Sequence, residues 1–200
     1  MIDTVIFDVG RVLVDWNYNR YLEEFSFSGE KKAKIKSAIF EGPYWPMADR
    51  GILTFDELLH GFISLAPEYQ EDICRVIDGA EKTISLYSYS VPFVKELKEK
   101  GLRLYLLSNY SRFLLEKTKH KMDFLPYMDG ALFSYSCHLI KPEAEIYRLL
   151  LDRFQIEPSH AVFFDDTPAN VQGAIDLGIH GIHFTGYENA RKALTALQVL

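Results

Sequence analysis

Short, continuous runs of apolar residues, each followed by polar residues, recur along most of this chain. Such runs are too short for helices and lack the apolar–polar alternation of a half-exposed strand, so they predict buried strands of a sheet that is covered on both faces. The predicted strands are residues 4–7, 102–107, 131–133, 161–164 and 179–184. A sheet buried on both faces needs helices between its strands, which narrows the choice of fold considerably.

Helical patterns fill the intervals between most of these runs. One predicted helix has Pro92 in its first turn and stops at Gly101, a second begins at Pro142, and a third extends from Pro168 to Leu177. Strand–helix–strand repetition gives parallel β-α-β units, whose crossovers are right-handed. The sequence therefore predicts an α/β fold with a doubly wound parallel sheet.

One long section, residues 16–89, shows helical patterning and no clear buried strand. Thr54 and Glu57 have the spacing of a capping box at a helix start. A helical insertion directly after the first strand would lie above the carboxyl ends of the strands, where open α/β sheets bind ligands. We therefore predict a helical cap of residues 16–89 on a core of residues 1–15 and 90–200. The alternative is a helical subdomain that only adds stability.

Composition and charge exclude several kinds of partner. The 200 residues carry 22 Lys and Arg against 28 Asp and Glu, and this net charge of −6 is evenly scattered. No basic patch for nucleic acid or an anionic membrane is expected. The longest stretch without these charged residues, 83–94, is far shorter than the roughly 20 residues of a membrane span. With no signal-peptide pattern and only two distant cysteines, we expect a cytoplasmic protein, monomeric or homodimeric, without a disulfide scaffold or a structural zinc.

Four polar features follow predicted strands and should meet at one edge of the sheet. They are Asp8, Ser108 with Asn109, Lys141, and Asp165 with Asp166. Each alone could be a turn former, a helix cap or a surface charge. Together, three carboxylates repel one another unless a cation is present, and hard oxygen ligands without His or Cys favour Mg²⁺. Lys141, next to a predicted helix start, would face an anion, so the set predicts a phosphoryl-transfer site.

The chain resembles the haloacid dehalogenase-like (HAD) hydrolase superfamily over essentially its full length. The resemblance rests on four motifs in a specific order: VIFDVG at 5–10, LLSN at 106–109, IKP at 140–142 and FFDD at 163–166. It implies a Rossmann-like core with an inserted cap. Within the superfamily the chain is most similar to small bacterial sugar-phosphate phosphatases of the glucose-1-phosphate type. It is more distantly similar to the amino-terminal phosphatase domain of soluble epoxide hydrolases.

The resemblance implies roles for particular residues. Asp8 would be the nucleophile that forms an aspartyl-phosphate, and Lys141 would neutralise the charges of the phosphoryl group and the nucleophile. The Ser108 hydroxyl and the Asn109 backbone amide would hold phosphoryl oxygens. The implied Mg²⁺ ligands are Asp8, the backbone carbonyl of Gly10, and Asp166, with Asp165 as a supporting carboxylate.

Gly10 departs from most phosphatases of this superfamily, which carry an acid/base aspartate two residues after the nucleophile. Glycine can offer its carbonyl to a metal but no proton to a leaving group, although the sugar-phosphate branch also has glycine there. Asp15 and Asp49 are the alternative proton donors. The departure leaves open a weakly active or inactive module that binds phosphate or a partner. A 2-haloacid dehalogenase fits poorly, because Asp165 and Asp166 would bring needless negative charge to a metal-free site.

The predicted cap offers further candidates for a substrate pocket. They are Trp16, Tyr44, Trp45, Asp49 and Arg50. The aromatic rings would stack on a sugar, and Arg50 would contact hydroxyls or phosphate; alternatively, the aromatic residues pack the interior of the cap itself. The sequence thus predicts a Mg²⁺-dependent phosphatase of a small phosphorylated metabolite, most simply a sugar phosphate.

Overall fold

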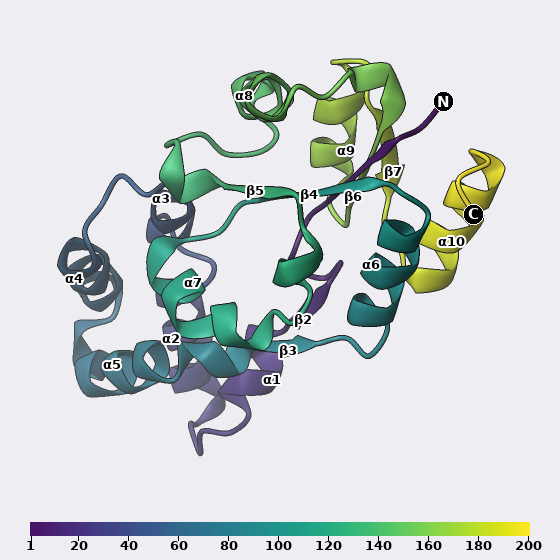
Figure 1. Ribbon diagram of the computed structural model, residues 1–200. Helices are drawn as coiled ribbons and strands as arrows, with labels where there is room; N and C mark the ends of the chain where they lie inside the picture. Colours follow the sequence, from purple (N-terminus) through teal and green to yellow (C-terminus); the bar gives the residue numbers. More distant parts are fainter.

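The computed structural model describes all 200 residues, and a five-stranded parallel sheet forms its centre (Figure 1). Its strands are β1 (Thr4–Phe7), β4 (Arg103–Ser108), β5 (Gly130–Phe133), β6 (Ala161–Asp165) and β7 (His180–His183). Their order in the sheet is β5-β4-β1-β6-β7, and every pair is parallel. From the central β1 the chain builds the sheet first toward β5 and then toward β7. The predicted doubly wound α/β fold is confirmed.

Five helices surround this sheet. They are α6 (Ser90–Glu99), α7 (Arg112–Thr118), α8 (Ala144–Phe154), α9 (Pro168–Ile175) and α10 (Tyr187–Ala196). Helix α6 precedes β4, and each of the others follows a strand of the sheet. Phe7 belongs to the buried cluster that contains residues of α6 and α10, whereas Ile6 belongs to the cluster formed with α8 and α9. Successive strand residues thus point into two separate buried layers. Burial on both faces explains why the strand sequences are apolar throughout.

A second group of helices interrupts the chain between β2 (Val14–Trp16) and β3 (Ile84–Leu86), which pair antiparallel as a two-stranded ribbon. These helices are α1 (Tyr18–Leu22), α2 (Gly29–Ile39), α3 (Tyr44–Arg50), α4 (Phe55–Leu65) and α5 (Gln70–Asp78). We call residues 18–78 the helical segment. Figure 1 shows it at the left and lower part of the view, on the side of the molecule opposite α6 and α10. The ribbon was not predicted, because strands of three residues are too short to show a periodic pattern.

Helix ends in the structure mostly follow the local sequence signals. The capping box at the start of α4 is present: the Thr54 hydroxyl accepts from the Glu57 amide, and the Glu57 carboxylate accepts from the Thr54 amide at 2.8 Å. The helix predicted from Pro142 instead begins at Ala144, because a turn precedes it, in which the Glu143 amide donates to the Ile140 carbonyl. Short 3₁₀ turns occupy Pro67–Tyr69, Ala80–Thr83, Lys119–Lys121, Leu125–Tyr127, Ser134–Ser136 and Pro158–His160.

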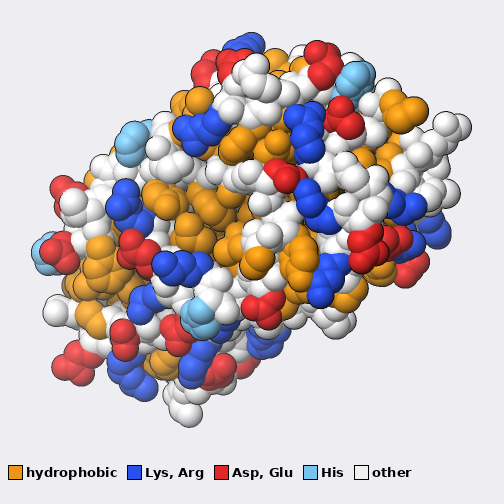
Figure 2. Space-filling model, viewed as in Figure 1, with side chains coloured by type: hydrophobic (Ala, Val, Ile, Leu, Met, Phe, Trp, Pro, Cys, Tyr) orange, Lys and Arg blue, Asp and Glu red, His pale blue; other side chains and the backbone are white.

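The surface agrees with the even charge pattern of the sequence. Figure 2 shows acidic and basic side chains interspersed over the visible face, with apolar side chains gathered between them near the centre. No helix in the structure combines the length and the apolar character needed to cross a membrane.

Candidate active site

The carboxyl ends of β1, β4 and β6 bring the predicted site residues together. In the parallel pairing Phe7 lies opposite Leu106 on one side and Phe164 on the other. Asp8 follows directly, and its backbone amide donates to the Phe164 carbonyl at 2.9 Å. The next residue of β6 is Asp165, so two aspartates meet at this edge because each comes directly after paired apolar residues.

Lys141 joins these two aspartates from the loop before α8. Its buried ammonium lies 2.9 Å from Asp8 Oδ1 and 2.6 Å from Asp165 Oδ2, and it donates to the Leu107 carbonyl at 2.9 Å. Burial lowers the pKa of Lys141, but the two carboxylates outweigh this effect and hold the pKa above its ordinary value. Lys141 is therefore a permanent cation. Two carboxylates hold Lys141 in position. The sequence analysis placed Lys141 directly before a helix start, but the helix begins three residues later, at Ala144.

Asn109 holds the Lys141 backbone from the end of β4. The Lys141 amide donates to Asn109 Oδ1 at 2.8 Å, and Asn109 Nδ2 donates to the Lys141 carbonyl at 3.0 Å. Ser108, the residue before it, is buried and contributes a hydrogen bond that lowers the pKa of Asp8. The Ser-Asn pair after β4 therefore connects the lysine loop to the sheet edge and faces the same cavity as Asp8.

Asp165 makes more contacts than the sequence predicted. Besides Lys141, it accepts from the Thr167 amide at 2.8 Å and from Asn170 Nδ2 at 3.0 Å, and its side chain is fully buried. Asn170 was missed by sequence reasoning, although a weak signal existed. Asparagine is a poor helix former, and here it lies inside the first turns of α9. Its amide replaces water around the buried carboxylate.

Asp166 is the carboxylate of the pair that remains available. Its side chain is 22% exposed, and its only ion pair is with Arg11 at 3.6 Å. Burial and the negative charge of Asp165 raise the pKa of Asp166, whereas Arg11 acts in the opposite direction. Oxygen atoms of Asp8, Asp165 and Asp166 all lie within 4.8 Å of one another. A set of carboxylates that exceeds its lysine counterion suits a hard divalent cation such as Mg²⁺.

Asp8 itself is an unusual carboxylate. Burial and the negative charge of Asp165 raise its pKa, the neighbouring Lys141 lowers it, and together these effects bring the pKa to about 6. Its Oδ1 also accepts from the Val9 amide at 2.7 Å. The side chain is thus held in one orientation by a lysine and a backbone amide, at a position where further positive charge would favour its ionised form.

A cavity of about 210 Å³ opens above Asp8 and separates two sets of residues. We call the first set the sheet side: Asp8, Ser108, Asn109, Lys141 and Asp166. The second set, the cap side, comprises Trp16, Trp45 and Asp49. Gly10 and Asn170 also line this cavity. Asp49 belongs to α3 of the helical segment, so residues distant in sequence enclose one small space, and most of the residues that line it are polar.

The aromatic residues of the cap side are packed as well as exposed to the cavity. Trp45 is 7% exposed; its ring centroid lies 5.9 Å from that of Trp16, 5.0 Å from that of Phe40 and 6.0 Å from that of Phe113. Both proposed uses of these rings, lining a pocket and packing the interior, are thus compatible with their placement. The indole N–H of Trp16 is buried without a hydrogen-bond partner.

Two of the predicted pocket residues lie outside this cavity. Arg50 forms a bidentate ion pair with Glu143 and donates to the His138 carbonyl at 3.1 Å, so it ties α3 to the loop before α8. Tyr44 packs edge-on against Phe62, with ring centroids 6.3 Å apart. The pairing of Arg50 could not be predicted from the sequence, since its partner is distant along the chain.

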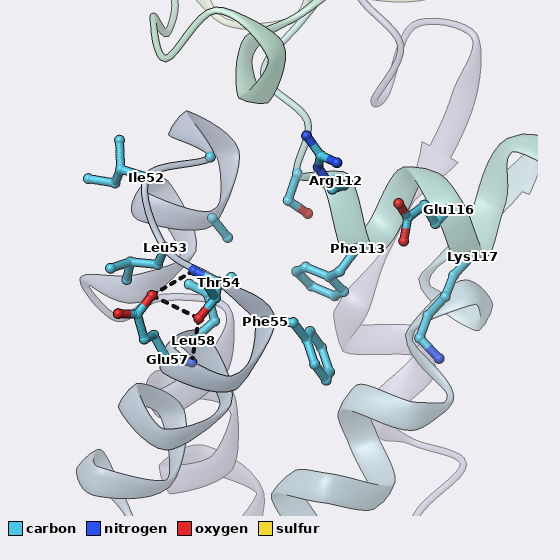
Figure 3. Close-up of a pocket in the computed structure, with 13 residues that line it drawn as sticks. Ile52, Leu53, Thr54, Phe55, Glu57, Leu58, Arg112, Phe113, Glu116 and Lys117 are labelled. Carbon is cyan, nitrogen blue, oxygen red and sulfur yellow. Dashed lines mark hydrogen bonds between the residues drawn. The ribbon is translucent and has the colours of Figure 1, made fainter.

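A larger cavity of about 680 Å³ lies beside the first, between the start of α4 and helix α7. Figure 3 shows Phe55 and Phe113 facing each other across it, with Arg112, Glu116 and Lys117 along one wall and the Thr54–Glu57 capping box on the other. Ala48 and Ser111, neighbours of cavity-lining residues in the first site, also border it. None of the groups at the sheet edge lines this second space.

Comparisons with known proteins identify the family. A family model described as haloacid dehalogenase-like hydrolase matches residues 2–178. A phosphorylated carbohydrates phosphatase of Thermotoga maritima is 27% identical over 191 residues, covering 90% of this chain and 84% of that protein. A D-ribitol-5-phosphate phosphatase of Bacteroides thetaiotaomicron is 25% identical over 217 residues, with 98% of each chain covered.

Two further similarities concern a longer protein and a solved structure. Mouse acyl-CoA dehydrogenase family member 10 is 29% identical over 211 residues, which cover 96% of this chain but only 19% of that protein. A HAD family enzyme of Bacteroides thetaiotaomicron, solved in complex with magnesium and inorganic phosphate, superposes with a TM-score of 0.74 at 21% identity, covering 90% of this chain and 92% of the other. The predicted hydrolase class is confirmed, and the chain belongs to the haloacid dehalogenase-like hydrolase family.

Proposed function

We propose that this chain is a Mg²⁺-dependent phosphatase that hydrolyses a small phosphorylated metabolite, with sugar phosphates as the substrate class. One observation carries the proposal: the Asp8 carboxylate is bound to the buried ammonium of Lys141 and faces a small cavity beside Asp166. A nucleophile held between a lysine and an excess of carboxylates is suited to phosphoryl transfer, in which positioning and charge neutralisation lower the barrier.

The reaction would proceed in two displacements at phosphorus. First, an Asp8 carboxylate oxygen attacks the phosphorus, the bond to the leaving oxygen breaks, and an aspartyl-phosphate forms. The Ser108 hydroxyl and the Asn109 backbone amide donate to phosphoryl oxygens, and Lys141 offsets negative charge on Asp8 and the phosphoryl group. Water then attacks the phosphorus of the aspartyl-phosphate, which releases inorganic phosphate and restores Asp8.

The chemistry of the carboxylate set supports Mg²⁺ as the cofactor. Asp8, Asp166 and the backbone carbonyl of Gly10 would hold the ion, with Asp165 as the supporting carboxylate. When bound, Mg²⁺ offsets the charge of phosphoryl oxygens in the transition state. The magnesium and phosphate complex of the superposed HAD enzyme supports the same choice of ion.

The substrate class rests on the relatives and on the cavity. Two relatives, of which the match covers 84% and 98%, are named for phosphorylated carbohydrates and D-ribitol 5-phosphate. The cavity is small, and most of the residues that line it are polar. We further propose that residues 16–89 act as a cap on the core of residues 1–15 and 90–200, and that Trp45 contacts the substrate.

Hydrolysis of p-nitrophenyl phosphate, measured with MgCl₂ and with EDTA, tests the proposal. We expect turnover with MgCl₂ that is lost with EDTA and recovered when excess Mg²⁺ is added. Absence of turnover with every divalent cation would instead favour a phosphate-binding module, the alternative that Gly10 keeps open. Metal-independent release of chloride from 2-chloropropionate would indicate a dehalogenase.

A further inference from the structure

The proposed reaction lacks a source for one proton. When the phosphorus–oxygen bond of an alkyl or sugar phosphate breaks, the leaving oxygen becomes a strongly basic alkoxide unless it is protonated. General acid catalysis of this kind typically contributes about 10²- to 10⁴-fold. Gly10, beside the nucleophile, has no side chain to donate this proton, so another group at the cavity must supply it.

Three carboxyl groups line the cavity, and two of them already have a role. Asp8 is the proposed nucleophile, and Asp166 is the proposed metal ligand, so Asp49 remains. Asp15, the other candidate from the sequence, lies on the ribbon, is paired with Arg20 and does not line the cavity. Of the two proton donors that the sequence analysis named, Asp15 and Asp49, the structure therefore favours Asp49.

The backbone of α3 fixes Asp49 in place. The Ser134 hydroxyl donates to the Asp49 carbonyl, and the next residue, Arg50, is bound by Glu143. Gly51 then ends the helix with φ of 70°, and a Cβ at this position would lie 2.5 Å from the Tyr135 carbonyl oxygen. These contacts pin the last turn of α3 against the core and keep the Asp49 side chain at the cavity, across from the sheet side.

The surroundings of Asp49 favour its protonated form. The charged groups that face it are Asp8 and Lys141, while Arg11 and Asp166 line the same cavity, and no cation forms an ion pair with it. Burial and the negative charge of Asp8 raise the pKa of Asp49 to about 7, although Lys141 and a hydrogen bond with the Ser111 backbone act the other way. A carboxyl group that is substantially protonated near neutral pH is suited to proton donation.

We propose that Asp49 is the general acid that protonates the leaving oxygen during transfer of the phosphoryl group to Asp8. This assignment rests on the proposed phosphatase function. The bond from Asp8 oxygen to phosphorus forms, the bond from phosphorus to the leaving oxygen breaks, and the Asp49 proton moves to that oxygen, giving a neutral alcohol. The proton lost by the water that later hydrolyses the aspartyl-phosphate restores the Asp49 carboxyl, so each turnover is balanced.

The test compares Asp49→Asn with wild type on p-nitrophenyl phosphate, phenyl phosphate and glycerol 2-phosphate. The quantity measured is kcat/KM, because it reports the steps up to release of the alcohol. We expect the variant to lose about 10²- to 10⁴-fold on glycerol 2-phosphate, less on phenyl phosphate, and only a few-fold on p-nitrophenyl phosphate, whose leaving group needs little protonation. Asp56→Asn, an exposed acid of the same helical segment, serves as the matched control and should leave all three unchanged.

Each contrary outcome is informative. An equal loss on all three esters, with a normal thermal melt, would overturn proton donation and assign Asp49 to binding. Unchanged turnover of glycerol 2-phosphate would overturn the role of Asp49 while leaving the phosphatase proposal intact. A wild type that hydrolyses none of the esters would overturn the proposed function itself.

Discussion

The sheet side and the cap side of the cavity are built in different ways. On the sheet side, Asp8, Ser108, Asn109 and Asp166 lie at or directly after strand ends, and Lys141 comes from the loop before α8. The Lys141 ammonium is bound by Asp8 and by the buried Asp165. On the cap side, Asp49 has no ionic partner and the Trp16 N–H has no acceptor. The contrast indicates that the charged groups of the core hold one another in place, whereas the cap side carries Asp49, the carboxyl group that we propose as the proton donor.

The largest effect that this contrast predicts lies on the sheet side. Asp8→Asn keeps the shape of the side chain but removes the attacking charge, so we expect turnover of p-nitrophenyl phosphate to fall by about 10⁴-fold or more. Steady-state kinetics on purified protein measures this loss. Asp152→Asn, an exposed aspartate on α8, is the matched control. Near-normal turnover in Asp8→Asn, with wild-type-like folding, would remove Asp8 from the mechanism.

The two adjacent aspartates should respond differently to substitution. Asp166→Asn should weaken Mg²⁺ binding by at least about 10-fold, because Asp166 has free oxygen atoms at the cavity. Asp165→Asn should chiefly lower stability, by about 3–5 kcal/mol, since Lys141 would lose a buried partner. Titration calorimetry with Mg²⁺ and chemical denaturation separate the two effects. Weaker Mg²⁺ binding in Asp165→Asn than in Asp166→Asn would reverse the assignment of the main ligand.

A smaller effect is expected when an acid is moved from the cap side to the sheet side. Gly10→Asp in the Asp49→Asn background should restore about 10-fold in kcat/KM on glycerol 2-phosphate, with little change on p-nitrophenyl phosphate. The backbone permits the change, because Gly10 does not have a positive φ and an added Cβ would lie 3.8 Å from the Trp16 Cβ. In the wild-type background the gain should be smaller, since Asp49 already supplies the proton. Equal gains in both backgrounds would argue that the two acids act independently.

The smallest effect is expected at Arg50, which ties the cap side to the core. Arg50→Gln removes a half-exposed ion pair with Glu143, so the free energy of unfolding should fall by only about 0.5–1 kcal/mol. If Arg50 contacts the substrate, as the sequence analysis predicted, KM for a sugar phosphate should rise several-fold, although the protein remains folded. Denaturation and steady-state kinetics on the same preparation therefore decide between the two roles, and Arg112→Gln, on the neighbouring cavity, is the matched control.

The same contrast explains how far sequence reasoning reached. The sheet and the meeting of Asp8, Lys141 and Asp165 could be predicted, because apolar strands of a parallel sheet place their carboxyl ends at one edge. The arrangement of the cap side could not be predicted, since the orientation of Asp49 depends on tertiary contacts of α3. The Arg50–Glu143 pair joins residues 93 positions apart, and no local sequence pattern predicts such a contact.

Turn chemistry accounts for the remaining differences. The helix after Lys141 begins later than its proline suggested, because a turn between Ile140 and Glu143 comes first. Proline is common in the first turn of a helix, but it is also common in the turn that precedes a helix. The two-stranded ribbon was not predicted for a different reason. Its two strands are about seventy residues apart in the chain, and each has only three residues.

The crowded carboxylates also affect the stability of the folded chain. Burial and Asp165 raise the pKa of Asp166 above its ordinary value, so the stabilising contribution of this group is present at acid pH and is lost as the pH rises through the folded-state pKa. At neutral pH the folded chain alone would therefore gain from a neutral residue at position 166. A divalent cation bound beside Asp166 would remove this cost, because its positive charge would offset the repulsion between Asp165 and Asp166.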